Sequence, residues 1–343
     1  MKEKSNILLI YTGGTIGMVK DYETGALRAF NFEELIKNIP ELNQLDCTLT
    51  GISFEKPIDS SNMNPAYWAQ IASMIEEHYT SYDGFVVLHG SDTMSYSASA
   101  LSFMLENLAK PVIFTGSQLP IGDLRTDAKE NLITSIQIAA LREKGKAVVQ
   151  EVGLYFEYKL YRANRTTKIN AEHFEAFASL NHPPLVESGV HLNVHYANLL
   201  PKISKHKALQ VHKTMDDHVA ILKLFPGLNK KVLQSVLNIP GLKALVLETY
   251  GAGNAPMDAW FLDELRIAIK KGLHVINVTQ CSGGSVSMGH YETSEKLREM
   301  QLVNGKDITT EAAITKAMYL LGTGVSGKLF KTIFETSLRG EML

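Results

Sequence analysis

Three short apolar segments of this chain each run directly into glycine and hydroxyl residues. The apolar segments cover residues 7–11, 85–88 and 112–114, and they lead into Thr12-Gly13-Gly14-Thr15-Ile16-Gly17, His89-Gly90-Ser91-Asp92-Thr93 and Thr115-Gly116-Ser117-Gln118. Apolar runs of this length bounded by glycine predict buried parallel strands. Ligands bind beyond the carboxyl ends of such strands. We therefore expect hydroxyls and a carboxylate at one edge of one sheet, the combination that nucleophilic catalysis needs.

Length and composition predict an ordinary globular protein with more than one core. The chain has 343 residues, and a chain of this length usually divides into two domains. Its formal net charge of −2 gives no electrostatic case for nucleic acid or an anionic membrane surface. No apolar run reaches the roughly 18 residues of a membrane span. We therefore expect neither nucleic acid nor a membrane as a partner.

The N-terminus and the cysteines favour a cytoplasmic protein. The first residues lead straight into a strand, without the apolar core or cleavage site of a signal peptide. Cys47 and Cys281 are the two cysteines, and they stand in unrelated contexts. Isolated cysteines in a chain without a secretion signal predict free thiols in a reducing compartment.

Strands and helices alternate along the chain, which predicts an α/β fold with a parallel sheet covered on both faces. In the first part, the spacing of apolar residues predicts helices over 65–79, 97–107 and 127–141. Asn64 is the expected N-cap of the first of these helices. In the last part the same pattern predicts strands over 219–224, 244–248 and 274–278 and helices near 229–237, 258–271 and 310–321.

The alternation fades over residues 186–216, which are rich in His, Asn and Lys and contain Pro201. We interpret this stretch as a linker between two domains. The larger, residues 1–185, is then an N-terminal catalytic α/β domain, and residues 217–343 form a smaller C-terminal α/β domain.

Each of these motifs also has a purely structural interpretation. Gly13-Gly14-Thr15 fits a plain turn, and it lacks the G-x-G-x-x-G of a dinucleotide loop and the Gly-Lys-Ser/Thr of a phosphate loop. Ser91 or Asp92 could cap the helix that follows, and Asp59-Ser60-Ser61-Asn62 could be a capping loop. The recurrence of hydroxyl-bearing loops at three strand ends favours a functional site.

Lys168 closes the basic segment Arg162-Ala163-Asn164-Arg165-Thr166-Thr167-Lys168. Such a segment is commonly a solvated surface loop. Beside a hydroxyl and a carboxylate, however, the Lys168 amine would serve as a base or proton relay, because burial lowers the pKa of an ammonium group. His191 and His195 lie four apart in a stretch with little periodicity, and we expect no metal site there. No His or Cys is spaced to activate Cys281.

Together these segments resemble the signature segments of L-asparaginases, and of their cytoplasmic type I branch in particular. The resemblance rests on residues 11–17, 89–94 and 115–118 and on four further segments, 59–61, 161–168, 250–254 and 338–341. It spans residue 5 to about residue 341. It implies a two-domain α/β fold, a homodimer or homotetramer, and hydrolysis of L-asparagine to L-aspartate and ammonia without a metal or cofactor.

Carried over by position, the resemblance implies Thr15 as the nucleophile and Ser91, Asp92 and Lys168 as a second catalytic group. The substrate-binding residues that it implies are Asp59, Ser60, Ser61, Ser91 and Asp92. Amide hydrolysis through a β-aspartyl ester splits one difficult step into two. A zwitterionic amino acid needs hydrogen-bond donors for its carboxylate and an acceptor for its ammonium group.

The chain departs from the family pattern at two points. Position 91 is Ser where the family has Thr, so the hydroxyl is kept and a methyl group is lost. Many members carry a Tyr in a mobile loop after the nucleophile, whereas this chain has Glu23-Thr24-Gly25-Ala26-Leu27 there, with Tyr22 nearby. Other type I-like members use a C-terminal Tyr, and Tyr291 fits that pattern. We expect Tyr291 rather than Tyr22 to assist Thr15.

The leading prediction is an L-asparaginase. One alternative is an asparaginase-like subunit of a tRNA-dependent amidotransferase, and another is an amino-acid sensor that has lost catalysis. The amidotransferase relative usually has an N-terminal extension, whereas the first strand here starts almost at Met1. The presence of Thr15, Asp92 and Lys168 argues against a silent sensor.

Overall fold

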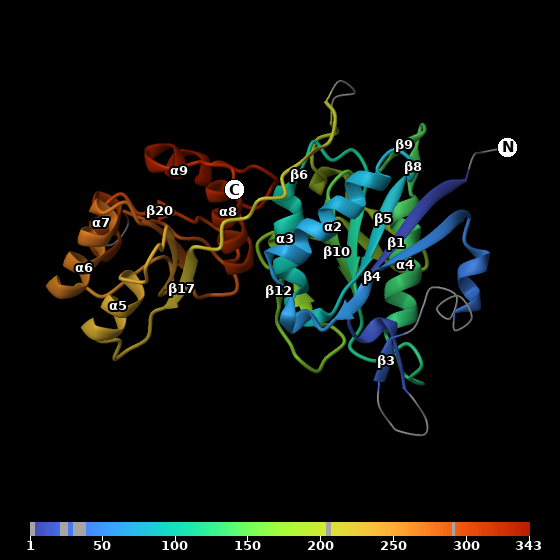
Figure 1. Ribbon diagram of the computed structural model, residues 1–343, viewed down its shortest axis with the longest axis horizontal. Coiled ribbons are helices and arrows are strands. Elements are labelled where there is room, and N and C mark those ends of the chain that lie inside the picture. Colours follow the sequence, from blue (N-terminus) through green and yellow to red (C-terminus); the bar gives the residue numbers. More distant parts are fainter. Residues whose placement is uncertain (1–3, 21–26, 30–38, 204–206, 290–291) are drawn as a thin grey trace. The chain divides into compact units, whose positions relative to one another are not determined.

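The structure is a computed structural model that describes residues 4–20, 27–29, 39–203, 207–289 and 292–343. The chain divides into two compact units, residues 1–213 and 214–343. Figure 1 follows both units along the sequence. Each unit is a sheet with helices packed on it, so the predicted fold class, a two-domain α/β protein with the larger domain first, is confirmed.

An eight-stranded sheet forms the centre of the first unit, with the order β15-β14-β11-β10-β7-β5-β1-β4. Strands β4, β1, β5, β7 and β10 run parallel, and β11, β14 and β15 continue the sheet in antiparallel pairs. The strands are β1 (Ser5–Gly13), β4 (Cys47–Ile58), β5 (Gly84–Leu88), β7 (Val112–Thr115), β10 (Val152–Phe156), β11 (Lys159–Arg162), β14 (Val186–Ser188) and β15 (Leu192–Val194).

The register of the central strands brings four loops to one edge of this sheet. Tyr11 of β1 lies opposite Leu88 of β5, and Leu88 in turn lies opposite Thr115 of β7. Gly13 pairs with Ile58 at the end of β4. The segments that follow β1, β4, β5 and β7 therefore leave the sheet side by side, as the three glycine- and hydroxyl-rich strand ends predicted.

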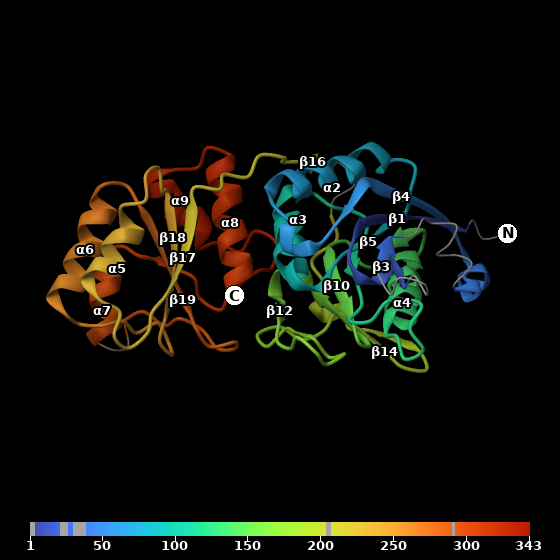
Figure 2. The ribbon, with the colours of Figure 1, turned by 60° about the horizontal axis from the view of Figure 1, so that its bottom comes forward.

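Helices cover both faces of the sheet. Ile7 and Leu9 of β1 pack with Leu132 and Ile136 of α4 (Ala128–Ala140), whereas the equally buried Leu8 and Ile10 alternate with them and face the other side. Figures 1 and 2 show α2 (Pro65–His78) and α3 (Met94–Met104) on the face away from α4. The central strands β1, β5, β7 and β10 are thus buried on both sides, which explains their continuous apolar runs.

Two of the three helices predicted in the first unit lie where the sequence placed them, and the third is shifted. Asn64 caps α2 by accepting from the backbone N–H of Ala66, as predicted. Helix α4 lies within one residue of the predicted range at each end. Helix α3 starts at Met94 rather than at residue 97, and Leu105–Glu106 forms strand β6 instead of extending it. Because α3 is buried almost all round, its apolar spacing marks no single face and locates its ends poorly.

Residues 186–216, which we predicted as a linker, include structured parts of the first unit. Strands β14 and β15 form the antiparallel edge of the large sheet, and β16 (Gln210–Val211) pairs with β6. The units divide after Lys213, so the connection is much shorter than the predicted linker. Very short edge strands with exposed polar side chains carry too little apolar alternation to be detected.

The second unit is built on a parallel four-stranded sheet with the order β17-β18-β19-β20. Most of its elements fall where the sequence predicted them, and α7, α9 and β20 are additions. Its elements are β17 (Val219–Lys223), α5 (Lys230–Leu237), β18 (Ala244–Thr249), α6 (Ala259–Lys270), β19 (His274–Thr279), α7 (Glu292–Glu299), β20 (Val303–Asn304), α8 (Thr310–Gly322) and α9 (Gly327–Phe334).

A buried ion pair ties the last residues of the chain to the second unit. Lys316 of α8 bonds to Glu341, and both side chains are fully buried. Lys316 also donates to the carbonyls of Phe334 and Thr336, each at 2.7 Å. Glu341 accepts from the backbone N–H groups of Leu338 and Arg339. The pair is therefore satisfied by hydrogen bonds on both sides, as a buried charge pair requires.

The remaining short strands pair locally within the first unit. They are β2 (Met18–Lys20) with β3 (Leu27–Ala29), β8 (Arg142–Glu143) with β9 (Lys146–Ala147), and β12 (Thr167–Lys168) with β13 (Phe177–Ala178). Among the residues that the structure describes, no helix combines the length and apolar character needed to cross a bilayer.

Candidate active site

Close backbone contacts at Gly13 and Gly14 join the loop after β1 to the end of β4 and to the loop after β5. Gly13 and Gly14 have φ values of +132° and +86°, conformations that favour glycine. A Cβ on Gly14 would lie 2.4 Å from the backbone nitrogen of Gly90, and one on Gly13 would lie 2.0 Å from the carbonyl oxygen of Ile58. Thr15 follows as the first residue of a short 3-10 helix and is half-buried. Its position beside the Ser91 loop is thus fixed by glycine packing.

Ser60 lies at the junction of the loops after β4 and β5. It is buried, its carbonyl accepts from the Thr93 hydroxyl at 2.7 Å, and a Cβ on Gly90 would lie 2.5 Å from its Oγ. Asp59 accepts from the backbone N–H and the hydroxyl of Ser61, at 2.8 and 2.9 Å. The backbone hydrogen bond and then the hydroxyl lower the pKa of Asp59, so this carboxylate is ionised at neutral pH.

Lys168 contacts both members of the Ser91-Asp92 pair. Its ammonium group donates to Ser91 Oγ at 2.9 Å and to Asp92 Oδ1 at 2.7 Å. The Lys168 side chain is 18% exposed and that of Asp92 is 66% exposed. The structure therefore brings together the three residues that the sequence resemblance grouped, with the lysine on the inner side and the carboxylate toward solvent.

The alternative that Ser91 or Asp92 merely caps a helix is wrong. Residues Ser91–Thr93 form a 3-10 turn before α3, and Thr93 occupies the N-cap position of α3 without a side-chain cap hydrogen bond. The prediction that residues 59–62 form a capping loop is confirmed, since the Asp59 side chain caps the 3-10 turn Ser60–Asn62. That role leaves Asp59 at the site edge, next to the buried Ser60.

Gln118 is a site residue to which the sequence assigned no role. Its Oε1 accepts from Ser91 Oγ at 3.3 Å, and its Nε2 donates to the carbonyls of Ala171 and His173 at 3.1 and 3.0 Å. Its backbone N–H donates to Asp127 at 3.0 Å. Gln118 thus links the hydroxyl of Ser91 to the loop that follows Lys168. Its position in Thr115-Gly116-Ser117-Gln118, the third glycine- and hydroxyl-rich segment after a strand, was the sequence signal that could have pointed to it.

His89 is a second residue without a predicted role. It is fully buried, its Nδ1 lies 2.7 Å from the carbonyl oxygen of Gly90, and burial lowers its pKa to about 4. The imidazole is therefore neutral at pH 7, with the Nδ1 proton donated to Gly90. This hydrogen bond orients the peptide immediately before Ser91.

The turn after β10 is linked to Asp127 through Asn131, which accepts from the backbone N–H of Glu157 and donates to Asp127. Glu157 and Tyr158 join β10 to β11 with positive φ values of +44° and +68°, which is costly for residues other than glycine. Burial, followed by the charges of Asp127, Glu130 and Glu175, raises the pKa of Glu157 to about 7. Glu157 is thus a group of this region that titrates near neutral pH.

Tyr291 and Tyr22, the two candidates to assist Thr15, lie outside the described residues. Tyr11 is a described tyrosine beside the nucleophile loop. Its hydroxyl donates to the Gly17 carbonyl at 3.1 Å, and burial raises its pKa to about 12. A Cβ on Gly17 would lie 2.2 Å from its ring. Tyr11 therefore shapes the turn that starts at Thr15.

The other sequence candidates lie elsewhere. His195 pairs with Glu187 at 2.8 Å, and the Cys281 thiol is free and exposed. Asp216, Asp217 and His218 form a described group whose ligand atoms are close enough to hold a metal ion, but Asp216 is already bonded to Lys243 at 2.5 Å. None of these groups belongs to the site around Ser91.

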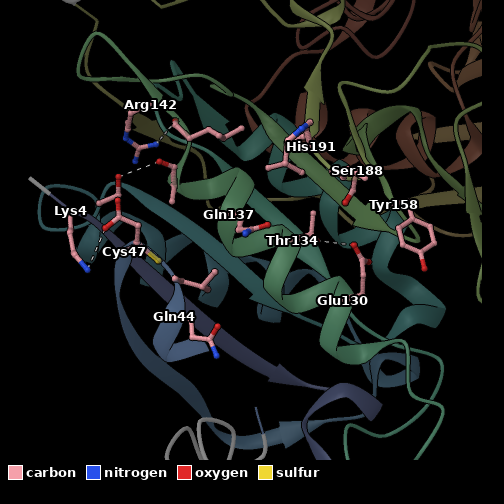
Figure 3. A pocket seen from close by; sticks show the side chains of 18 residues that line it. Lys4, Gln44, Cys47, Glu130, Thr134, Gln137, Arg142, Tyr158, Ser188 and His191 are labelled. Atoms are coloured by element: carbon pink, nitrogen blue, oxygen red, sulfur yellow. Dashed lines mark hydrogen bonds and ion pairs between the residues drawn. The ribbon is translucent and has the colours of Figure 1, made fainter. Parts of the chain in front are cut away.

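A hollow of about 980 Å³ in the first unit contains none of the predicted site residues. Lys4, Cys47 and Arg142 line it together with residues of α4, including Glu130, Thr134 and Gln137 (Figure 3). Lys4 and Cys47 stand at the amino ends of β1 and β4, whereas Ser91 follows the carboxyl end of β5. One end of the hollow therefore lies at the amino ends of β1 and β4, and its lining extends along α4 to Tyr158 without reaching Ser91.

Hydroxyls, a carboxylate and a lysine meet at the carboxyl ends of parallel strands, the set of groups that an enzyme with a hydroxyl nucleophile needs. The family models described as "Asparaginase, N-terminal" and "Glutaminase/Asparaginase C-terminal domain" match residues 6–200 and 218–334. The chain belongs to the asparaginase family, in its type I branch.

Individual relatives agree with this assignment. L-asparaginase 1 of Escherichia coli (strain K12) is 41% identical over 341 residues, which cover 99% of this chain and 98% of the relative. The crystal structure of L-asparaginase I from Vibrio cholerae superimposes with a TM-score of 0.90 at 38% identity, covering 99% of this chain and 100% of that one. A subunit of the glutamyl-tRNA(Gln) amidotransferase of Pyrococcus abyssi is 31% identical, over 98% of this chain and 76% of its own.

Proposed function

We propose that this protein hydrolyses L-asparagine to L-aspartate and ammonia, with Thr15 as the nucleophile. The observation that carries the proposal is the contact of Lys168 with Ser91 Oγ and Asp92 Oδ1 at 2.9 and 2.7 Å, in the loop that packs against Gly14. The membership in the asparaginase family supports the substrate class.

The Thr15 hydroxyl would attack the side-chain amide carbon of asparagine and displace ammonia, to which the threonine proton is finally transferred. This leaves a β-aspartyl ester on Thr15. Water then cleaves the ester, releases aspartate and returns a proton to Thr15. Each step exchanges one acyl–heteroatom bond for another, so the two steps need no oxidant, reductant or cofactor.

The α-amino and α-carboxylate groups of the substrate would be held by the polar residues at the loop junction. Asp59, whose lowered pKa keeps it ionised, and Asp92 would accept from the ammonium group. The hydroxyls of Ser60 and Ser61 would donate to the carboxylate, with Ser91 beside them. Charge-assisted hydrogen bonds of this kind are stronger than neutral ones and fix the orientation of the reacting amide.

Ser91 and Lys168 would form the proton relay. In the structure Lys168 donates to both Ser91 and Asp92, so the resting contacts fit the charged ammonium form. A substrate ammonium group beside Asp92 would compete with Lys168 for that carboxylate. The neutral amine would then accept the proton of Ser91 while Ser91 accepts that of the attacking group.

Ammonia release from free L-asparagine, without tRNA, tests the function directly. Thr15→Ala should keep its fold and lose at least ~10³-fold in turnover, because only positioning and electrostatic effects remain when a covalent nucleophile is removed. Lys168→Met should lower turnover with little effect on folding. A Thr15→Ala variant with more than a tenth of wild-type turnover removes Thr15 from this role.

The same assay separates the alternatives. An amidotransferase subunit would depend on its tRNA-bearing partner, and a silent sensor would bind asparagine without releasing ammonia.

We also propose a cytoplasmic homodimer or homotetramer. The free thiols of Cys47 and Cys281 support a reducing compartment, and sedimentation velocity would give the number of subunits.

A further inference from the structure

A second pocket of the first unit is lined mainly by basic side chains. It has a volume of about 270 Å³ and lies where Asp83 and Lys110 precede strands β5 and β7. One of the charged residues that line it is acidic, Asp83, and the others are Lys110, Arg142, Lys146, Lys202 and Lys207. For a chain with a net charge of −2, this is a strong local excess of positive charge.

Backbone carbonyls hold two of these cations in place. The Lys110 ammonium donates to the carbonyls of Tyr79 and Tyr82 and lies 4.8 Å from the centre of the Tyr79 ring. The Arg142 guanidinium donates to the carbonyls of Ala139 and Leu141, both at 2.9 Å, and to that of Asp83. Carbonyl dipoles orient a cation without neutralising it. The two charges are thus fixed in position before any ligand arrives, which lowers the entropic cost of binding.

The single carboxylate of the pocket wall compensates only part of this charge. Asp83 lies 4.0 Å from Arg142 and also accepts from the backbone N–H of Asn6 at 2.9 Å. The Arg142 side chain is 14% exposed, so water screens its charge poorly. Burial lowers the pKa of both Lys110 and Arg142, and the charge of Asp83 raises both in part. The lowered pKa values show that both cations are poorly solvated in the pocket wall.

We propose that this pocket binds a phosphate group, either as inorganic phosphate or on a small phosphorylated metabolite. A phosphate group carries enough negative charge and enough acceptor oxygens to bond several cations at once, and a guanidinium with lysine ammoniums is a favourable donor set for it. The volume lies just below the range of pockets that hold drug-sized ligands, which fits a small anion.

This pocket is distinct from the proposed active site. Strand β5, five residues long, runs from the pocket edge to the Ser91 loop, a span of roughly 17 Å at the usual rise of a strand. A phosphate bound here would leave the Thr15 and Ser91 loops free. Saturating asparagine should therefore not displace phosphate, and failure of either proposal leaves the other standing.

Isothermal titration of the full chain with sodium phosphate, at constant ionic strength, tests the proposal. The pocket variant is Lys146→Glu, Lys202→Glu and Lys207→Glu, three exposed lysines of the wall. The matched control is Lys231→Glu, Lys271→Glu and Lys328→Glu, three exposed lysines of the second unit, which changes the net charge equally. We expect saturable binding to the wild type, weakened at least about tenfold in the pocket variant and less than about twofold in the control.

A parallel titration with glucose 6-phosphate identifies the source of the phosphate group. Tighter binding of the sugar phosphate indicates a metabolite, and tighter binding of inorganic phosphate indicates the free ion; both outcomes support the pocket. Phosphate should also raise the melting temperature of the wild type above that in chloride of equal ionic strength. Absence of saturable binding by the wild type, or equal weakening in the pocket and control variants, would overturn the proposal.

Discussion

Replacing Gly14 by alanine should damage both stability and activity, because the new Cβ would point into the Ser91 loop. That atom would lie 2.4 Å from Gly90 N, whereas ordinary van der Waals contact begins at 3.4 Å. The two loops must therefore separate by roughly 1 Å (3.4 − 2.4). Overpacking of this kind costs about 1–3 kcal/mol, and the positive φ of Gly14 adds about 1–2 kcal/mol for an L-residue.

Gly145→Ala supplies the matched control. Gly145 lies in the same unit and has a similar φ of +74°, but its Cβ would meet open space. It should lose only the backbone term, about 1–2 kcal/mol, against about 2–5 kcal/mol for Gly14→Ala. The difference between the two variants isolates the contact between the loops after β1 and β5.

Each unit contains one tryptophan, Trp68 in α2 and Trp260 in α6. In a Trp260→Phe background, urea unfolding followed by fluorescence reports on the first unit alone. Ammonia release should fall at least ~10²-fold in Gly14→Ala, because a displacement of about 1 Å at a reacting group costs that much. Equal stability of the Gly14 and Gly145 variants, together with full activity, would refute the role of this contact.

Three further predictions concern the neighbouring groups. Glu157→Gln should become more stable relative to the wild type as the pH rises from 5 to 8, measured by urea unfolding. The pKa of Glu157 is raised from 4.5 to about 7 in the folded state, so the wild type loses stability as the pH rises through this interval whereas the Gln variant does not. A stability difference that stays constant with pH would contradict the raised pKa of Glu157. Ser91→Thr should keep most of the ammonia-releasing activity and Ser91→Ala should lose it, whereas an active Ser91→Ala would exclude the Ser91 hydroxyl from the chemistry. His89→Phe removes the donor to the Gly90 carbonyl and should cost about 1–3 kcal/mol in the free energy of unfolding, and an unchanged urea midpoint would show that the hydrogen bond contributes nothing.

The sequence predicted the elements that position the site better than the contacts within it. The apolar runs before Gly13, Gly90 and Gly116 are sufficient to predict parallel strands and a shared edge, because burial on both faces leaves a clear apolar signal. The contact of Lys168 with Ser91 spans 77 residues of sequence, and no local pattern encodes it. Its prediction came from the family resemblance.

Other features carried no usable sequence signal. Gln118 and His89 act through single hydrogen bonds to Ser91 and to the Gly90 carbonyl, and neither bond follows from periodicity or charge. Strands β14 and β15 of the supposed linker are three residues each, too short to show alternation. The basic pocket could not be predicted from the sequence, because Lys110, Arg142 and Lys202 are far apart in the chain and only the fold brings them together.

The buried pair of Lys316 and Glu341 has a practical consequence for how the protein is prepared. Removing the last three residues would delete Glu341 and leave the Lys316 ammonium uncompensated in the second unit, a change of the kind that costs about 3–5 kcal/mol. The terminal residue itself behaves differently, since Leu343 is 83% exposed. A purification tag appended after Leu343 can extend into solvent, whereas trimming the chain for crystallisation should stop short of Glu341.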